Sequence, residues 1–531
     1  MLARLARDLP AFIRRTMTLD EAAERVRRRI ASREQTFLSL VERAIYGHRP
    51  SPYRELLRCA GCELGDFKRL VTGEGIEGAL RVLADRGVYV TFDELKGRRP
   101  AERGSATFHF TAEQFDSPLV DPHWMVYTGG TGGVPTSVFR SLDLVDDMTP
   151  AIALTNSAHD MTRARHIFWV TNPLPPLLSY TILRQPILAW FHPVSPFPRK
   201  AWVVAACFQL SGRLAGHSIP MPQFLDLQDA DRLARWLARR PRDGRRLVIG
   251  TMASAAVRIA LAAREAGTDL TDVTFRVQSE PLTPARYEHL VATGARVFVS
   301  YSLTEMIDLA LSCGTPTAPD DVHFGTDRYA LIGRQRPVVE GGPAVDAMLV
   351  TTLTVTAPKI CLNAETGDYA NVQDRACGCV LGQLGLTTHL SEVRSFEKLS
   401  GEGVTFVRSG LLAILEEVLP GRFGGSSVDY QLVEEEAPDS STRLVLRVHP
   451  SVGRLDDAEL KRALLDELGR GGIVDWHHAE LLRRADSITV RREPPLATAA
   501  GKVLPFQLHR AQSVGERRPA DAFRYPRRHD E

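Results

Sequence analysis

The spacing of apolar and polar residues divides the chain into regions of different character. In the first hundred or so residues, apolar side chains recur three and four positions apart at 19–33, 52–60 and 71–87, which predicts helices. From about residue 125, short apolar runs alternate with glycine turns and amphipathic stretches. These runs predict strands at 202–208, 246–250, 273–278 and 296–300, with a helix at 255–266 and a strongly β-prone stretch at 347–356.

Alternating strands and helices predict an α/β fold, with a large N-terminal domain whose mostly parallel sheets are flanked by helices. After about residue 394 the pattern changes again. Strands are predicted at 443–448 and 486–490, with a helix at 456–469 opened by Asp456 or Asp457. This part reads as a small α+β C-terminal domain. The charged, proline-containing tail at 516–531 is expected to be poorly ordered.

Length and composition narrow the class of protein. The chain has 531 residues, 44% of them hydrophobic and 24% charged, which indicates a globular protein of two or three domains. The net charge of +2 gives no reason to expect a nucleic acid or a membrane surface as partner. No apolar run approaches the 18 or so residues of a membrane span. The basic start lacks the apolar core of a secretion signal, although a transit peptide stays an alternative.

Cysteine and lysine usage adds two points. Seven cysteines are an odd number in a large chain, which argues against a disulfide framework and for a reducing, cytoplasmic location. Only seven of the 66 basic residues are lysines, and the other 59 are arginines. A lysine within a motif is therefore more informative here than in an average chain.

A glycine-rich segment is the first candidate for binding chemistry. It runs from Thr128 through Gly129, Gly130, Thr131, Gly132 and Gly133 to Thr136. Glycines leave backbone N–H groups uncovered, and threonine hydroxyls add donors, so a polyanion such as a phosphate chain can approach closely. The segment lacks the Gly-Lys-Ser/Thr end of a Walker loop. A flexible surface linker is the alternative interpretation.

Three further motifs follow in order. The first is Ser279-Glu280-Pro281, which precedes a helix and the strand that ends before Tyr301-Ser302-Leu303-Thr304-Glu305. The second is Thr366-Gly367-Asp368, and the third is the stretch from Pro495 to Gly501-Lys502. Each has an ordinary explanation when taken alone: a capped helix start, a common turn and a surface lysine.

Together, over about 370 residues, the four motifs resemble the signatures of the adenylate-forming superfamily, which includes the acyl-CoA synthetases, peptide-synthetase adenylation domains and luciferases. The loop departs from the usual signature because Gly129 and Gly132 replace a serine and a threonine, and Thr136 replaces a lysine. Threonine after the proline is a feature of the phenylacetate–CoA ligase branch. The residues just before Thr366 also depart from the family pattern.

The resemblance implies a role for each motif. Thr128, Thr131 and the loop glycines would bind phosphates, with Ser279, Glu280 and Pro281 beside the nucleotide. Tyr301 would pack on adenine, Thr304 would touch the α-phosphate and Glu305 would hold Mg²⁺, for which a carboxylate oxygen is a suitable hard ligand. Asp368 would bind the ribose, as would Arg394 at the hinge between the domains. Lys502 would bridge the substrate carboxylate and the α-phosphate during adenylation.

The implied domain ranges are a helical N-terminal extension at 1–120, an adenylation core at 121–393 and a mobile C-terminal domain at 394–515. Family members rotate this small domain after adenylation to admit the acceptor thiol. Residues 172–196, rich in proline and aromatics, lie where relatives build part of the acid pocket.

A zinc site is a separate expectation. Cys313, His323, Cys377 and Cys379 supply three thiolates and one imidazole, a donor set that suits a closed tetrahedral Zn²⁺ site. Some phenylacetate–CoA ligase relatives carry a similar set. The alternative is a group of reduced, partly buried cysteines. We interpret Cys59 and Cys62 as structural.

The resulting hypothesis is an AMP-forming acid–thiol ligase that uses ATP, Mg²⁺ and coenzyme A on a small-molecule carboxylic acid. Transfer of the acyl group to a carrier protein or an amine is an alternative, and so is a catalytically inactive nucleotide-binding homologue. The identity of the acid and the oligomeric state, including a homodimer, are open at this point.

Overall fold

The computed structural model describes fifteen stretches of the chain, which are residues 1–127, 137–171, 173–193, 199–226, 229–240, 242–337, 344–395, 400–401, 404–405, 410–436, 442–471, 479, 482–483, 488–497 and 502–509. By their contacts, the residues form two compact units. The larger comprises Met1–Ser400, Ser426–Val428 and Leu496–Leu504, and the smaller comprises Gly401–Gly425, Asp429–Pro495 and Pro505–Glu531. Lys502 therefore belongs to a segment that groups with the larger unit.

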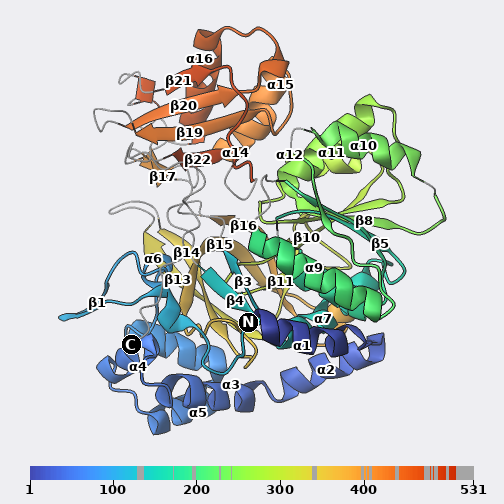
Figure 1. The fold of residues 1–531 in the computed structure, drawn as a ribbon. Helices are drawn as coiled ribbons and strands as arrows, with labels where there is room; N and C mark the ends of the chain where they lie inside the picture. The colour runs from blue at the N-terminus through green and yellow to red at the C-terminus, as the bar shows by residue number, and fades with distance from the viewer. Residues whose placement is uncertain are drawn as a thin grey trace. The chain divides into compact units, whose positions relative to one another are not determined.

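The larger unit is built on a twelve-stranded mixed sheet with the order β13-β14-β15-β16-β12-β11-β10-β9-β8-β5-β6-β7 (Figure 1). From β10 to β7 neighbouring strands are parallel, and from β10 to β13 they are antiparallel. The strands are β5 Arg165–Trp169, β6 Ile187–His192, β7 Pro222–Phe224, β8 Leu247–Met252, β9 Val273–Gln278, β10 Arg296–Tyr301, β11 Ala310–Ser312, β12 Val322–Phe324, β13 Tyr329–Pro337, β14 Ala344–Thr352, β15 Ala364–Asp374 and β16 Thr388–Ser395. The predicted α/β class is confirmed.

Helices cover both faces of the parallel strands. Along β5, Ile167 and Trp169 belong to one hydrophobic core and Phe168 to another, because successive side chains of a strand point to opposite faces. The first core includes residues of α3, α4, α5, α10 and α11, and the second includes residues of α1, α2, α7, α8 and α9. These helices are α1 Leu2–Ile13, α2 Leu19–Ala31, α3 Arg33–Val41, α4 Pro52–Cys59, α5 Leu64–Asp85, α7 Leu142–Ala158, α8 Leu174–Ile182, α9 Arg199–Leu214, α10 Ala230–Arg239 and α11 Ala253–Glu265.

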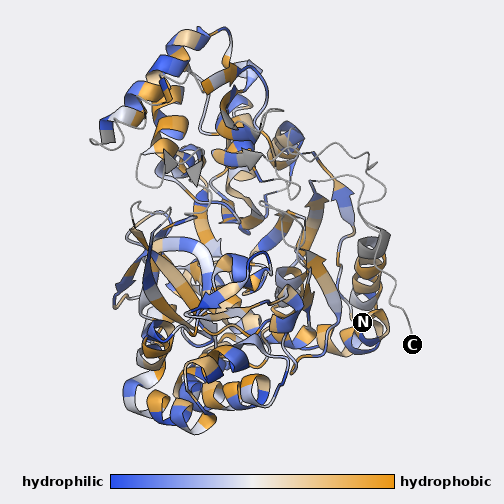
Figure 2. Cartoon of the chain, turned by 90° about the vertical axis from the view of Figure 1, so that its left-hand side faces the viewer, coloured by the Kyte–Doolittle hydropathy of each residue, from blue (hydrophilic) through white to orange (hydrophobic). Residues whose placement is uncertain are grey.

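The predicted N-terminal helices are present, and Figure 2 shows hydrophilic and hydrophobic residues interleaved along them, as expected of helices at a surface. Shorter elements complete this unit: α6 Phe92–Leu95, β1 Ala101–Arg103, β2 Ala106–Phe108, β3 Trp124–Tyr127, β4 Ser137–Arg140, α12 Pro284–Val291 and α13 Val380–Gln383. Within the described ranges, no helix combines the length and the apolar character needed to cross a bilayer.

One predicted strand is wrong. Residues 202–208 lie inside α9, where Ala205 and Phe208 are buried while Trp202 and Val203 are about half exposed. Burial at a spacing of three is the helical period, and a short continuous apolar run cannot by itself distinguish a helix from a buried strand.

The smaller unit contains a four-stranded sheet in the order β21-β20-β19-β22. Its strands are β19 Tyr430–Glu436, β20 Thr442–Val448, β21 Ile488–Arg491 and β22 Phe506–His509, preceded in the chain by β17 Ser400–Gly401, β18 Val404–Thr405, α14 Leu411–Ala413 and α15 Leu419–Phe423. Helix α16 Asp457–Leu468 packs against β21. Its predicted N-cap is confirmed, since the Asp456 carboxylate accepts hydrogen bonds from the backbone N–H groups of Ala458 and Glu459.

Candidate active site

Two of the sequence motifs lie at the carboxyl ends of adjacent parallel strands. Ser279-Glu280-Pro281 directly follows β9, and Tyr301 is the last residue of β10, which pairs with β9. In open α/β sheets this edge is where ligands bind, because the loops leaving the strands gather there. Ser279 has a φ of 71°, a left-handed conformation that is uncommon for a residue with a side chain.

Tyr301 and Asp368 come together although 67 positions separate them. The Tyr301 hydroxyl donates a 2.7 Å hydrogen bond to Oδ2 of Asp368, which lies on β15. Burial, together with the charge of Asp368, holds the pKa of Tyr301 well above its usual value, so the phenol stays protonated as a donor. Sequence analysis predicts adenine and ribose contacts for this pair, and the structure places the two side chains next to each other.

Glu305 is buried, and its carboxylate forms an ion pair with Nζ of Lys96. The two side chains are only 6% and 4% exposed, so each needs the other's charge to be tolerated in this position. Sequence analysis missed Lys96. The signal was available, because Lys96 is one of only seven lysines in the chain. In this structure Lys96 neutralises Glu305, and the predicted contact of Glu305 with Mg²⁺ stays a prediction.

The backbone of the Thr304–Asp308 loop is held by three buried side chains. Arg140 donates a 2.6 Å hydrogen bond to the carbonyl of Thr304, and Arg328 donates one of 2.6 Å to that of Asp308. Tyr329 donates to the carbonyl of Ile307 at 2.9 Å. Burial lowers the pKa of Arg140 to about 10, which still leaves it charged at neutral pH. These donors hold the backbone on both sides of Glu305.

The glycine-rich segment, Thr128, Gly129, Gly130, Thr131, Gly132 and Gly133 included, lies outside the described residues. Its flanks are described. Strand β3 ends at Tyr127 and β4 begins at Ser137, and these two residues pair in an antiparallel ladder. Because Arg140 at the end of β4 bonds to Thr304, this hairpin is tied to the loop that carries Glu305.

Lys502 is positioned through its neighbour in the chain. The backbone N–H of Val503 donates a 2.8 Å hydrogen bond to Oε1 of Glu280, immediately after β9. Glu280 also accepts hydrogen bonds from the backbone and hydroxyl of Ser254, at 2.7 and 2.9 Å, and from Arg286 at 3.2 Å. Both oxygens of Glu280 are therefore occupied, and Oε1 holds the segment Leu496–Leu504 through Val503. The structure supports an anchoring role for Glu280, and its predicted contact with nucleotide stays a prediction.

Arg394, predicted at the hinge, lies on β16 opposite Tyr369, one position beyond Asp368. Its guanidinium is 3.5 Å from Oδ2 of Asp320. In the region where sequence analysis places part of an acid pocket, Tyr180 and Trp190 are buried. The Tyr180 hydroxyl accepts a 2.8 Å hydrogen bond from Arg276, so this aromatic group contributes to the core.

The four predicted zinc ligands converge in the larger unit. Sγ of Cys377 lies 3.8 Å from Sγ of Cys313, 3.5 Å from Sγ of Cys379 and 3.5 Å from Nε2 of His323. Nε2 of His323 lies 3.1 Å from Sγ of Cys379. Tetrahedral zinc with Zn–S near 2.3 Å and Zn–N near 2.0 Å would separate sulfurs by about 3.8 Å, and sulfur from nitrogen by about 3.5 Å. The donor atoms therefore fit this metal.

The cluster also contains a histidine that sequence analysis missed. Ligand atoms of Cys313, His323, Cys377 and His389 all lie within 4.8 Å of one another. Nδ1 of His389 is 2.7 Å from Oδ1 of Asp321, and its buried Nε2 has no hydrogen-bond partner among the described residues. A carboxylate behind a histidine is the usual support of a metal ligand. His389 is therefore a fifth candidate donor, which a spacing rule based on cysteines could not reveal.

Comparison with known proteins gives a likeness of fold. No family model matches the sequence, and no curated protein matches it. Among solved structures, the chain is similar to a 2-hydroxyisobutyryl-CoA ligase in complex with 2-HIB-AMP and CoA, at 15% identity and a TM-score of 0.42, covering 96% of this chain and 90% of that one. It is also similar to the anthranilate CoA ligase AuaEII in complex with anthranoyl-AMP, at 13% identity and a TM-score of 0.44, covering 80% of this chain and 73% of that one.

A third similar structure is the O-succinylbenzoate coenzyme A synthetase MenE from Bacillus subtilis, in complex with ATP and magnesium, at 12% identity and a TM-score of 0.43, covering 73% of this chain and 70% of that one. With identities of 15% or less and TM-scores below 0.5, the activity of this chain has to be inferred from its own residues.

Proposed function

We propose that this chain is an ATP-dependent ligase that activates a carboxylic acid as its acyl-adenylate and passes the acyl group to coenzyme A. The observation that carries the proposal is the convergence at one edge of the sheet. The hydrogen-bonded pair Tyr301 and Asp368, the buried Glu305 and the segment bearing Lys502 come from three separate parts of the sequence. They are the same residues whose motifs resemble the adenylate-forming enzymes.

In this mechanism, Asp368 accepts hydrogen bonds from the ribose of ATP, and Tyr301 lines the adenine site. Lys502 neutralises the charge that develops as the substrate carboxylate attacks the α-phosphate and pyrophosphate leaves. The compact, mobile ammonium group of lysine suits this role. Bound Mg²⁺ would supply additional positive charge at the phosphates, and Glu305 would hold it. Coenzyme A then attacks the acyl carbon through its thiol and releases AMP.

Within this reaction class, we place the chain nearest to the phenylacetate–CoA ligases. Thr136 after the proline and the cluster of Cys313, His323, Cys377 and Cys379 support this placement. A carrier protein or an amine as acyl acceptor is the alternative within the same chemistry. It would share the first half-reaction and differ only in the second.

A second candidate function is supported by two observations. Lys96 already neutralises Glu305, and the glycine-rich segment departs from the family signature at Gly129, Gly132 and Thr136. A protein that binds nucleotide or acid without catalysis would tolerate both features. This candidate predicts nucleotide binding with no chemistry on the α-phosphate.

ATP–pyrophosphate exchange with a panel of aromatic, medium-chain and small carboxylic acids separates the two. The ligase proposal predicts acid-dependent incorporation of labelled pyrophosphate into ATP for at least one acid. Binding of ATP with no exchange for any acid in the panel would favour the non-catalytic homologue.

A further inference from the structure

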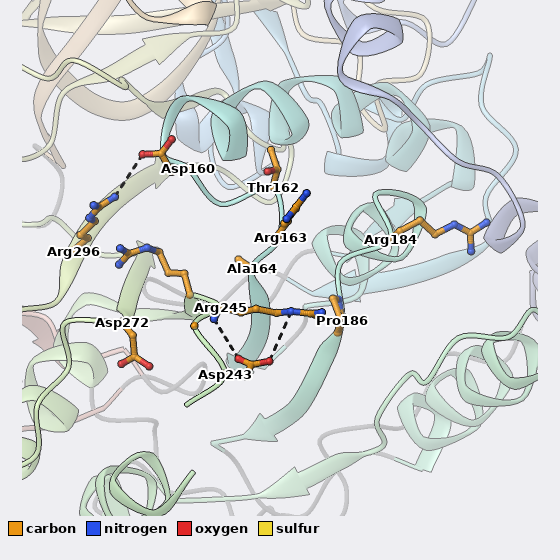
Figure 3. A pocket seen from close by; sticks show the side chains of 12 residues that line it. Asp160, Thr162, Arg163, Ala164, Arg184, Pro186, Asp243, Arg245, Asp272 and Arg296 are labelled. Atoms are coloured by element: carbon orange, nitrogen blue, oxygen red, sulfur yellow. Dashed lines mark hydrogen bonds and ion pairs between the residues drawn. The ribbon is translucent and has the colours of Figure 1, made fainter. Parts of the chain in front are cut away.

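A polar cavity opens at the edge of the sheet opposite to the candidate active site (Figure 3). Its volume is about 780 Å³, within the range of small-molecule sites. Its lining residues directly precede or begin the parallel strands β5, β6, β8, β9 and β10, whereas the nucleotide motifs follow β9 and β10. Strands of six residues place the two edges about 20 Å apart. The cavity is therefore separate from the proposed nucleotide site.

Positive charge dominates the lining. The lining includes five arginines, namely Arg163, Arg184, Arg245, Arg246 and Arg296, and three aspartates, namely Asp160, Asp243 and Asp272. The guanidinium of Arg184 points away from the others, toward His217 and the carbonyl of Arg14 (Figure 3). Two of the aspartates pair with arginines outside the lining, Asp243 with Arg165 and Asp272 with Arg240, and Asp243 also lies 3.7 Å from the lining residue Arg245. Asp160 is exposed and lies 3.9 Å from Arg296. The carboxylates therefore leave part of the arginine charge uncompensated.

The backbone around Arg246 is firmly held. Gly244 has a φ of 77°, and the backbone N–H of Arg245 donates to the side chain of Asp243 at 3.2 Å, which closes the turn before β8. The carbonyl of Arg246 accepts a 3.0 Å hydrogen bond from the backbone of Arg165, and its guanidinium donates to the carbonyl of Thr271 at 3.3 Å. The loops that precede β5, β8 and β9 are thereby joined at Arg246.

Arg246 also experiences the charge of another arginine. Burial, and next the nearby Arg296, lower the pKa of the Arg246 guanidinium. No carboxylate among the described residues forms an ion pair with Arg246, and the same is true of Arg163, whose side chain is exposed at the rim. The neighbouring guanidinium groups of Arg246 and Arg296 match the several oxygens of a phosphate group, which arginine binds in a forked geometry, while Arg163 adds a positive charge across the cavity from Arg296 (Figure 3).

From these observations we propose that this cavity is a second ligand site that binds a phosphate-bearing small molecule, with Arg163, Arg246 and Arg296 as its anion-binding groups. The proposal is independent of the function assigned to the opposite edge. Either site could be disproved while the other stands.

Calorimetric titration of the full chain with inorganic phosphate and with glycerol 3-phosphate, at constant ionic strength in chloride, tests it. We expect saturable binding by the wild type, weakened at least tenfold in Arg246→Gln/Arg296→Gln and at least threefold in Arg163→Gln. Because Arg163 is exposed, the second variant keeps the test valid if the double variant folds poorly. Tighter binding of glycerol 3-phosphate would identify an organic phosphate as the ligand, and equal binding would identify the phosphate ion.

The matched control is Arg232→Gln/Arg235→Gln, which removes the same charge from two exposed positions of α10. It should bind within twofold of the wild type, as should Asp368→Asn at the opposite edge. The proposal is overturned if the wild type shows no saturable binding, if the control pair loses as much affinity as the cavity pair, or if Asp368→Asn abolishes binding.

Discussion

Individual buried charges limit what a substitution at the candidate site can reveal. Glu305 and Lys96 lie in an almost fully buried ion pair, and Lys96 also lies 5.2 Å from the centre of the Phe92 ring. Removing one partner leaves the other charge buried and uncompensated. Glu305→Gln, the obvious test of a metal ligand, therefore changes stability as well as chemistry. The two effects have to be measured separately.

A double-mutant cycle on this pair gives a first prediction. Lys96→Met and Glu305→Gln should each lower the free energy of unfolding by about 3–5 kcal/mol, because each leaves an unpaired buried charge. The double variant should recover most of that loss. Chemical denaturation at pH 7 measures all four proteins. Additive losses in the double variant would show that the two residues are not coupled.

For catalysis, Glu305→Gln should strongly weaken Mg·ATP use in pyrophosphate exchange, because it removes the carboxylate that would hold the metal. The double variant Lys96→Met/Glu305→Gln controls for stability, since it lacks the same carboxylate without leaving a buried charge. It should be as inactive as the single variant. Near wild-type exchange by the double variant would show that Glu305 is not a metal ligand.

At the scale of elements, the cysteine–histidine cluster joins distant segments. Cys313 directly follows β11, His323 and His389 lie on the paired strands β12 and β16, and Cys377 precedes α13. We predict about one Zn²⁺ per chain, bound by thiolates and imidazole. Cys377→Ser should lose the metal and lower the melting temperature. Elemental analysis that finds no zinc in protein prepared without chelator would refute the site.

His389→Gln in the same assay identifies the fourth ligand. If Cys379 completes the set, this variant should keep its zinc. If His389 does so, the variant should lose zinc as Cys377→Ser does, and Cys379→Ser should keep it.

The packing of β5 against α8 gives a pH-dependent prediction. His166 on β5 is fully buried, stacked on Tyr180 of α8 at 3.6 Å and hydrogen-bonded to Gln185 at 2.7 Å. Burial lowers the pKa of His166 to about 3. The unfolded chain, with a histidine pKa near 6.5, binds this proton more readily, so folding stability is complete above about pH 6.5 and falls as the pH decreases toward 3.

Between pH 7.5 and 5.5 this single group should cost about 1.4 kcal/mol of unfolding free energy. Denaturation of the wild type and of His166→Gln at both pH values isolates the contribution, because the other titrating groups are common to both proteins. The variant should show a smaller loss by about that amount. An equal loss in both proteins would mean that folding does not lower the pKa of His166.

Sequence reasoning worked best for elements whose periodicity is local. Helices α2, α4 and α11 and strands β8, β9 and β10 begin and end close to the predicted residues, because apolar spacing and turn residues determine them. It failed at 202–208, where a continuous apolar run carries no period. It also missed Lys96 and His389, whose importance comes from partners 209 and 68 positions away in the chain. Such contacts are created by the fold and leave no local pattern.

At the scale of the whole molecule, the central question is the role of Lys502. This residue belongs to Leu496–Leu504, which groups with the larger unit, while the chain on either side belongs to the smaller one. Glu280 holds this segment through Val503. Under the proposed function, Lys502 acts in the adenylation step. The rotation for thioester formation that the resemblance to the adenylate-forming enzymes implies would have to carry this segment away from Glu280.

The decisive measurement compares the two half-reactions in Lys502→Ala, with Lys68→Ala as the control at an exposed lysine. The acid is the one found by pyrophosphate exchange. We predict that Lys502→Ala slows acyl-adenylate formation from ATP by about 10²–10³, a few kcal/mol of transition-state stabilisation, with ATP binding nearly unchanged. Thioester formation from preformed acyl-adenylate and coenzyme A should continue at the wild-type rate, and Lys68→Ala should match the wild type in both steps. A Lys502→Ala variant that forms acyl-adenylate normally, or that is equally slowed in both steps, would contradict the account.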